Sequence, residues 1–221
     1  MGRHANVSSQ TAKRILNSKG YKYSKFYKRV YLNEERREER VEFAQRMLDE
    51  EFDWSKVLIS DECSIWLNKC KPKTLWTKNT MLEEGSDTHG PKIHCWGGIT
   101  ARGALRLEIF EKNLEAKGYL KIIKRKKVEM DQLYPDGWVF QHDGSGVHRA
   151  DIVKRYLDTF EEEPLSWPGY SPDLSPIENI WGWLKHEVSK EMPSDIQRLK
   201  ACVRRHWRRI NAIFQDHISR R

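Results

Sequence analysis

Apolar residues along the chain recur with two different periods, and the changes between them predict the order of helices and strands. Helical spacing covers residues 7–20, 34–50, 114–133 and 146–160, and two further helices follow Pro176 and Ile196. Short apolar or alternating runs predict strands at 57–60, 64–67, 92–100, 104–110, 137–143 and 163–167. An antiparallel group of strands followed by alternating helix and strand predicts an α/β fold, with helices on the faces of a mixed sheet.

Two of these elements carry more detailed expectations. In the helix at 34–50, Val41, Ala44 and Leu48 form one stripe with Phe43 and Met47 beside it, so we expect this helix to pack on a core. The run "KVLISDECSIWL" is interpreted as two short strands separated by a tight turn. Asp61 would then end the first strand.

Composition and length suit one domain with a small appendage. The chain has 221 residues, of which 38% are hydrophobic and nine are Trp, so it can bury a substantial core. We assign residues 1–33 to a helical and linker segment and 34–221 to the main domain. Within that domain, the polar stretch 69–91 is an inserted loop or a protruding hairpin. The net charge of +8 favours a polyanionic partner.

Other classes of protein are disfavoured. The four cysteines Cys63, Cys70, Cys95 and Cys202 form no CxxC pair, so we expect reduced thiols in an intracellular compartment rather than a disulfide framework. His89, His94 and Cys95 lack the paired spacing of a structural zinc site. No apolar run approaches the ~18 residues that span a bilayer, so no membrane partner is expected.

Two aspartates stand at predicted strand ends. Asp61 follows "VLIS" and Asp143 follows "WVFQH". Ligands of such sheets gather at the ends of strands, and converging carboxylates are the usual ligands of Mg²⁺ or Mn²⁺. Each aspartate has a structural alternative: Asp61 could cap a turn, and Asp143 in "HDGSG" could form an Asx-turn.

A third carboxylate follows a stiffened loop. In "WPGYSPDLSPIENIW", Pro168, Pro172 and Pro176 restrict the backbone ahead of Glu178. Ser175 and Glu178 also have the spacing of a capping box, in which the glutamate turns back to the helix N-terminus. A glutamate in that position cannot also face a metal ion without a change of rotamer.

The stretches "ISDECSIWL", "FQHDGSGVH" and "WPGYSPDLSPIENIWGWLK", with 34 residues between Asp143 and Glu178, resemble the catalytic domain of Tc1/mariner transposases. That spacing is similar to the Tc1-like branch, and the resemblance covers about residues 34–221. It implies an RNase H-like fold with a five-stranded mixed sheet and flanking helices. It also implies that Asp61, Asp143 and Glu178 form a DDE triad that binds Mg²⁺, for which Mn²⁺ can substitute, as two ions.

The same resemblance implies a cut-and-paste DNA transposase. Such an enzyme hydrolyses a phosphodiester at the transposon end and transfers the 3′ hydroxyl into target DNA. Its partners would be transposon ends and target DNA, bound by a homodimer, and its location the nucleus. His148 matches the histidine of the family, where it would contact phosphate or a water of the metal site, or be only a residue of the first helical turn. Gly144 and Gly146 depart from the Asn and Pro usual in the family.

Basic residues supply candidate DNA contacts. Residues 7–30 resemble only the end of the second helix-turn-helix of such enzymes, and their Lys25, Lys28 and Arg29 lie on a DNA strap or a solvated linker. In "KIIKRKK" the candidates are Lys124, Arg125, Lys126 and Lys127, for which a solvated helix face is the alternative. Two rival functions remain open: a non-catalytic DNA-binding protein derived from a transposase, and an RNase H-like nuclease.

Overall fold

The computed structural model describes residues 8–20, 32–67 and 90–218. The chain divides into two units, Met1–Leu32 and Asn33–Arg221. In the first, helix α1 (Ser9–Ser18) begins where the side chain of Ser8 accepts the N–H of Thr11 at 3.1 Å. The predictions for Lys25, Lys28, Arg29, Cys70, His89 and nearly all of the 69–91 insertion lie outside the described residues.

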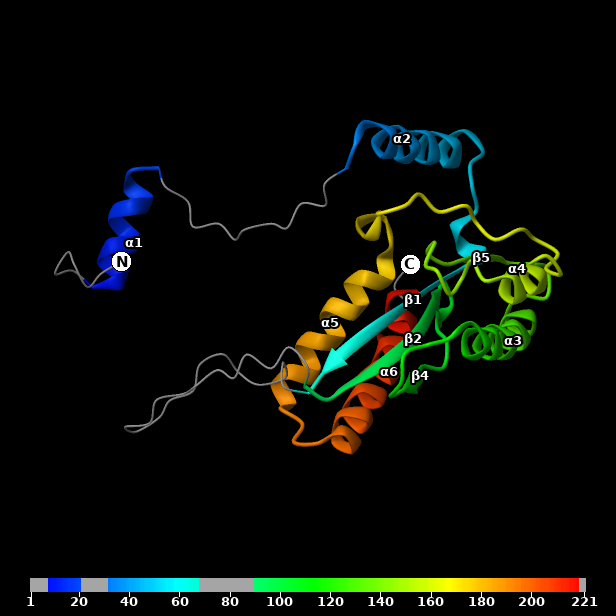
Figure 1. Cartoon of the computed structure of the whole chain (residues 1–221). Helices are drawn as coiled ribbons and strands as arrows, with labels where there is room; N and C mark the ends of the chain where they lie inside the picture. The colour runs from blue at the N-terminus through cyan, green and yellow to red at the C-terminus, as the bar shows by residue number, and fades with distance from the viewer. Residues whose placement is uncertain (1–7, 21–31, 68–89, 219–221) are drawn as a thin grey trace. The chain divides into compact units, whose positions relative to one another are not determined.

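The second unit is built on a five-stranded sheet (Figure 1). Its central pair is antiparallel, β1 (Val57–Trp66) with β2 (Lys92–Thr100), and β5 (Val139–Gln141) joins the free side of β1 in parallel. The short strands β3 (Gly103–Ala104) and β4 (Glu108–Phe110) both pair with β2. The mixed sheet expected from the sequence is therefore confirmed.

Strand β1 corrects one detail of that expectation. It is a single strand of ten residues rather than two strands with a turn, and Asp61 lies in its middle, opposite Gly97 of β2. The strand is continuous because β2 pairs with it from Ile59 to Trp66, whereas its parallel partner β5 ends at the pair Ile59–Gln141. Asp61 is thus beyond the end of one neighbour, although its own strand continues.

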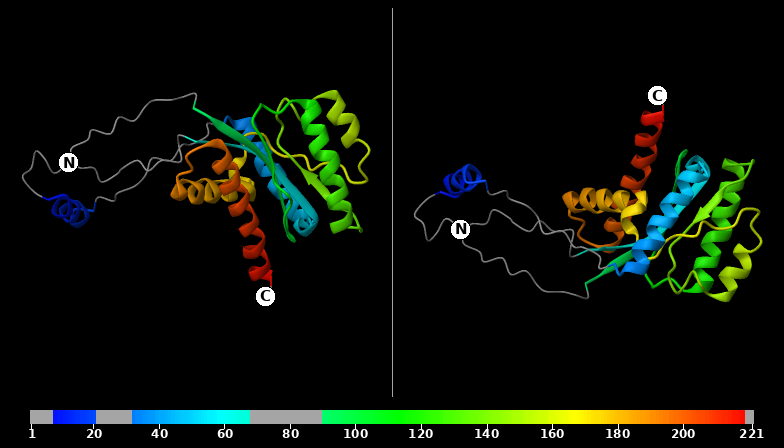
Figure 2. Two further views of the ribbon diagram at one scale, coloured as in Figure 1. Left: turned by 90° about the horizontal axis from the view of Figure 1, so that it is seen from below. Right: turned by 90° about the horizontal axis from the view of Figure 1, so that it is seen from above.

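Helices cover both faces of the sheet. Helices α5 (Pro176–Glu191) and α6 (Ile196–Ile218) bury their apolar residues against one face, where Cys63, Ile65, Ile93 and Cys95 project. Helices α3 (Ala116–Leu133) and α4 (Asp151–Leu157) pack on the other face, around Leu58, Trp96 and Phe140. Figure 2 shows the sheet between these two pairs of helices. The helical spacing after Pro176 predicts an apolar stripe of α5, of which Ile177, Trp181, Leu184 and Val188 are buried and Ile180 is partly buried.

Helix α2 (Glu34–Asp49) packs through a different stripe from the one predicted. Val41 and Leu48 are 68% and 72% exposed, whereas Phe43 and Met47 are buried. The ring of Phe43 meets Trp167 edge to face at 5.3 Å between centroids. The segment 163–167, predicted as a strand, has no strand geometry, and a single backbone hydrogen bond, from Leu165 N–H to the carbonyl of Phe140 at 2.7 Å, ties it to β5.

Within the described part of the chain, none of the helices combines the length and apolar character needed to cross a bilayer. Cys63, Cys95 and Cys202 are buried and form no disulfide.

Candidate active site

The register of the parallel strand pair brings the two predicted aspartates together. Ile59 of β1 pairs with Gln141 of β5, and Asp61 and Asp143 each follow two residues later. Both line a cavity of about 550 Å³, and Glu178 from the first turn of α5 lines it as well. Three carboxylates, from β1, from the loop after β5 and from α5, therefore share one cavity.

Asp61 is fixed by a tryptophan from α5. The indole Nε1 of Trp181 donates a hydrogen bond to Asp61 Oδ2 at 3.0 Å, and the ring stacks on Trp207 at 5.1 Å between centroids. The strand residue opposite Asp61 is Gly97, where a Cβ atom would lie 2.6 Å from Cη2 of both indoles. Gly97 thus provides the space that lets α5 approach the strand closely enough for this hydrogen bond.

Glu178 does not form the capping box that its sequence position allows. Ser175 is the N-cap of α5, but its side chain makes no cap hydrogen bond; instead, the N–H of Glu178 donates to the carbonyl of Ser175 at 3.2 Å. Within the described residues, no hydrogen bond or ion pair engages the carboxylate of Glu178. That carboxylate is therefore available to a ligand in the cavity.

The proline loop before Glu178 is tied to helix α2. Arg40 forms a two-pronged ion pair with Asp173, with nitrogen to oxygen distances of 2.9 and 2.6 Å. The guanidinium of Arg36 lies 3.8 Å from the ring centre of Tyr170. Together with the contact between Phe43 and Trp167, these interactions hold the segment that leads into α5.

Asp143 is held by His148. The imidazole Nδ1 lies 2.7 Å from both the carboxylate Oδ1 and the backbone carbonyl of Asp143. The N–H of Ser145 also donates to Oδ1, at 3.1 Å, so the Asx-turn considered from the sequence is present. These hydrogen bonds to the charged form, above all that from His148, lower the pKa of Asp143. No bond engages Oδ2 within the described chain, which leaves this oxygen for a ligand.

The negative charge near Asp61 is only partly compensated. Burial raises the pKa of Asp61 to about 7, and the charges of Glu178 and then Glu62 contribute to the increase. A divalent cation would offset the repulsion between these negative charges. A set of carboxylate oxygens is the donor set that Mg²⁺ and Mn²⁺ prefer. The residues present therefore fit such an ion.

Two other groups of side chains have ligand atoms within 4.8 Å of one another in the described chain. The first, Glu62, Asp143 and His148, shares Asp143 with the cavity. The second consists of Glu191, Cys202 and His206, where α5 ends beside α6. There His206 lies 2.6 Å from Glu191, which also pairs with Arg205, so these contacts tie the two helices together. The carboxylates of Asp61, Asp143 and Glu178 do not form a group in which all ligand atoms lie within this distance of one another.

Sequence reasoning missed a basic residue of the cavity. Arg149, next to His148, is exposed and lines the cavity, and no ion pair within the described residues occupies it. The signal was the basic residue directly after the family histidine in "GVHRA". Gly144 and Gly146 adopt no left-handed conformation, and a Cβ at either would meet nothing within 4 Å. Neither position therefore requires glycine.

The predicted basic cluster on α3 is largely engaged with protein groups. Lys126 is 3% exposed, and its ammonium contacts Glu129 at 2.9 Å and the carbonyl of Arg106 at 2.6 Å. This environment disfavours the predicted DNA contact of Lys126, because its charge is buried among acceptors. Arg125 pairs with Glu108 at 3.0 Å, while Lys124 remains exposed.

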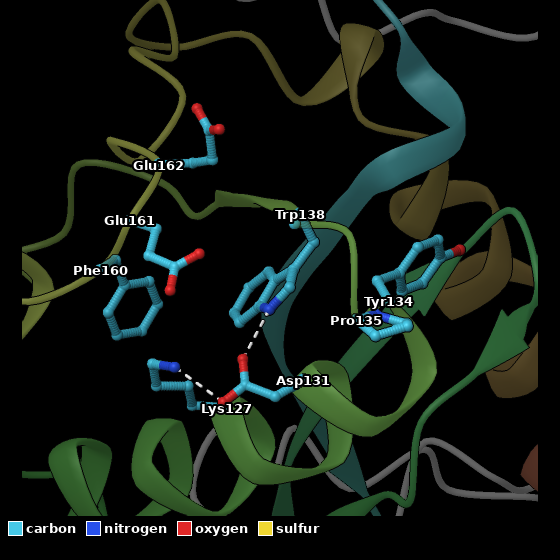
Figure 3. Close-up of a pocket in the computed structure, with 9 residues that line it drawn as sticks. Lys127, Asp131, Tyr134, Pro135, Trp138, Phe160, Glu161 and Glu162 are labelled. Atoms are coloured by element: carbon cyan, nitrogen blue, oxygen red, sulfur yellow. Dashed lines mark hydrogen bonds and ion pairs between the residues drawn. The ribbon is translucent and has the colours of Figure 1, made fainter.

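Lys127 lies at a second cavity, of about 270 Å³, which contains none of the triad residues (Figure 3). Its ammonium pairs with Asp131 at 2.7 Å, and Asp131 also accepts the indole N–H of Trp138 at 3.0 Å. Figure 3 shows Asp131 between these two donors. Lys127 is thus an ion-pair partner within its own helix.

Comparison with known protein families identifies the class of protein to which this fold and this cavity belong. The model of the DDE superfamily endonucleases matches residues 56–200, and the chain belongs to this family. The match begins just before β1 and ends in α6, so it includes all three cavity carboxylates.

Two transposases are among the proteins that this chain resembles in sequence. The chain is 27% identical over 181 residues to the transposable element Tc3 transposase of Caenorhabditis elegans, covering 77% of this chain and 54% of that protein. It is 25% identical over 195 residues to the Tc1 transposase of the same organism, covering 82% and 70%. The resemblance noted in the sequence is thereby confirmed, and the chain spans about half the length of the Tc3 protein.

Solved structures agree on the fold. The Mos1 mariner paired end complex with Mn superposes with a TM-score of 0.71 at 17% identity, covering 97% of this chain and 71% of that chain. The Mos1 strand transfer complex gives 0.65 at 18%, covering 97% and 70%. The isolated catalytic domain of Mos1 gives 0.62 at 16%, covering 86% and 95%. These matches confirm the RNase H-like fold.

Proposed function

We propose that this chain is the catalytic core of a cut-and-paste DNA transposase, which hydrolyses phosphodiesters at transposon ends and transfers the 3′ hydroxyl into target DNA. The observation that carries the proposal is the shared cavity of Asp61, Asp143 and Glu178. Membership of the DDE endonuclease family supports it. The chain spans about half of its Tc3 relative, so the activity of the whole protein is part of the proposal.

Asp61, Asp143 and Glu178 would hold Mg²⁺ or Mn²⁺, as two ions. Such ions, when bound, stabilise the negative charge that develops on the attacking and leaving oxygens of a phosphodiester. The chain's own residues supply the geometry. Trp181 fixes one oxygen of Asp61, and His148 and Ser145 fix one oxygen of Asp143. The proline loop sets where α5 begins and so where Glu178 stands.

Arg149 gives the cavity a group for the substrate. Arg149 is the basic residue that lines a cavity with three carboxylates, and guanidinium groups bind phosphate oxygens through paired hydrogen bonds. We infer that Arg149 contacts a phosphate beside the reacting one. This contact would hold the DNA backbone in line with the triad without occupying the metal ligands.

The proposed partners are transposon-end and target DNA, and the proposed assembly is a homodimer on DNA in the nucleus. The net charge of +8 supports a polyanionic partner. The Mos1 structures carry further support, since they include a paired end complex and a strand transfer complex of that transposase.

The test measures Mn²⁺ binding by calorimetry and nicking of supercoiled plasmid in the same buffer. We expect wild type to bind and nick, and Asp61→Asn, Asp143→Asn and Glu178→Gln to lose both. If wild type binds DNA but does not nick it, the result would instead support a non-catalytic DNA-binding protein derived from a transposase. Faster cleavage of an RNA–DNA hybrid than of duplex DNA would support an RNase H-like nuclease.

A further inference from the structure

We propose that Glu62 is a positioning residue of the active site, which fixes the carboxylate of Asp143 by holding the imidazole of His148 in place. This inference rests on the proposed function, because it concerns the same metal ligand. Glu62 neither lines the cavity nor belongs to the triad. Its role follows from three features of its surroundings.

The first feature is the alternation of side chains along β1. Successive residues of a strand point to opposite faces of the sheet. Asp61 lies on the face of α5, where Trp181 reaches it, while Glu62 points to the other face, where His148 lies. The adjacent carboxylates of Asp61 and Glu62 therefore contact residues on opposite faces of the sheet.

The second feature is the position of His148 between two acids. Its Nδ1 is 2.7 Å from Asp143 Oδ1, and its Nε2 is 3.2 Å from Glu62 Oε1. One ring nitrogen faces each carboxylate, so the ring cannot flip or rotate without losing both contacts. Glu62 belongs to the ten-residue strand β1, where it pairs with Trp96 of β2, and it thus anchors the ring to the sheet.

The third feature is the ring stack that encloses the histidine. The side chain of His148 is 3% exposed and lies against Tyr119, at 4.1 Å between ring centroids, and against His142, at 4.7 Å. The hydroxyl of Tyr119 is 2.9 Å from Nδ1 of His142, which ties the outer rings to each other. The stack fixes the plane of the imidazole, and Glu62 fixes its direction within that plane.

The consequence concerns the carboxylate of Asp143, the metal ligand that this arrangement orients. Its side chain is 55% exposed, and it stands in a loop beside Gly144 and Gly146. With His148 in place, Oδ1 is bound and Oδ2 remains for a ligand. Outer groups that orient metal ligands in this way typically contribute about 10- to 100-fold to metal affinity or activity.

The experiment compares wild type with Glu62→Gln, Glu62→Ala and His148→Ala, and with the double variant of Glu62→Ala and His148→Ala. The readouts are the Mn²⁺ concentration for half-maximal nicking, the maximal nicking rate and the melting temperature. We expect Glu62→Ala to raise the half-maximal Mn²⁺ concentration about 10-fold. Glu62→Gln keeps an acceptor oxygen, so it should raise the half-maximal Mn²⁺ concentration less than Glu62→Ala does. The double variant should be no worse than His148→Ala, since Glu62 acts through that ring.

Glu191→Gln is the matched control, because it changes another glutamate that holds a buried histidine, His206, outside the cavity. It should lower the melting temperature without changing the Mn²⁺ requirement. If wild type nicks and both Glu62 variants keep its Mn²⁺ requirement, the positioning role is overturned while the proposed function stands. Additive losses in the double variant also overturn it. Should Glu62→Ala not fold, Glu62→Gln decides. A wild type that neither binds Mn²⁺ nor nicks overturns both proposals.

Discussion

The indole N–H of Trp181 on helix α5 donates to the Oδ2 of Asp61 on strand β1, 120 residues earlier in the chain, at 3.0 Å. The contact joins the packing of the domain to its candidate chemistry, because the ring that carries the N–H also lies in the main core. A hydrogen bond from Trp181 stabilises the charged form of a carboxylate whose burial favours the neutral form. Loss of this hydrogen bond should therefore alter metal binding as well as stability.

Trp181→Phe should weaken Mn²⁺ binding. The variant keeps an aromatic ring against Trp207 but removes the donor to Asp61, so the pKa of Asp61 rises further and less of it is ionised at neutral pH. Calorimetry should show weaker Mn²⁺ binding at pH 7, with a smaller difference at pH 8.5. Trp207→Phe is the control: it loses a hydrogen bond to the carbonyl of Leu105 and should lose about 1–3 kcal/mol of stability with unchanged Mn²⁺ affinity. Equal Mn²⁺ affinities for Trp181→Phe and wild type would contradict the coupling.

Gly97→Ala should destabilise the domain by about 1–3 kcal/mol, as overpacked cores do. The added methyl would lie 2.6 Å from Cη2 of Trp181 and of Trp207, so one or both rings must move. Urea unfolding measures the loss. Gly182→Ala is the control on α5, where a Cβ meets nothing within 4 Å, and it should stabilise the helix by about 0.5–1 kcal/mol. A neutral Gly97→Ala would show that the indoles have room to retreat.

Asp61→Asn should be more stable than wild type at pH 8 without metal. Burial and two nearby acids raise the pKa of Asp61 from 3.8 to about 7 in the fold, so between these values the folded state holds a proton that the unfolded chain has released. Stability from this group is therefore present at pH 4 and falls as pH rises through 7. The variant lacks this loss, and its advantage should disappear near pH 4.

Melting curves across this pH range test that sign, and Mn²⁺ provides a second check. The ion should raise the melting temperature of wild type at pH 8 but not that of Asp61→Asn, because a ligand that binds only the folded state stabilises it. Asp53→Asn is the control, since the pKa of Asp53 is lowered, mainly by a hydrogen bond from Ser55. A wild type that is more stable than Asp61→Asn at pH 8 without metal would refute the prediction.

Arg149→Ala should weaken binding to a short DNA duplex and reduce the slope of log K against log salt by about 1, as expected for the loss of one phosphate contact. Arg155→Ala, on an exposed position of α4 outside the cavity, is the matched control and should leave the slope unchanged. Fluorescence anisotropy at several salt concentrations measures both. Equal slopes for the two variants would remove Arg149 from the DNA interface.

Lys126→Met should lower stability without changing DNA affinity. The ammonium of Lys126 contacts Glu129, Glu108 and the carbonyl of Arg106, and its removal deprives these acceptors of a buried donor, at a cost of about 1–3 kcal/mol. Lys127→Met loses a partly exposed pair with Asp131 and should cost less than about 1 kcal/mol. A fall in DNA affinity for Lys126→Met at unchanged stability would restore it as a phosphate contact.

The sequence by itself determined the elements whose apolar pattern allows one solution. Helix α5 buries the stripe that its spacing predicts, and β2 and α6 also lie where predicted, because a long amphipathic pattern has only one apolar face. The candidate site was accessible for a similar reason. Asp61, Asp143 and Glu178 stand in motifs long enough to be matched to a family, and the cavity then contains all three.

Only the tertiary structure decided the points that depend on distant partners. The continuity of β1 depends on β2, about 30 residues later, and the buried stripe of α2 depends on Trp167. Lys126 is buried because Glu129 and the carbonyl of Arg106 surround its charge, although its position in a run of basic residues suggests exposure. The link from Glu62 through His148 to Asp143 spans 86 residues and leaves no period in the sequence. Periodicity reports which face of an element is apolar; the partner that each polar side chain meets is set by the packing of those faces against one another.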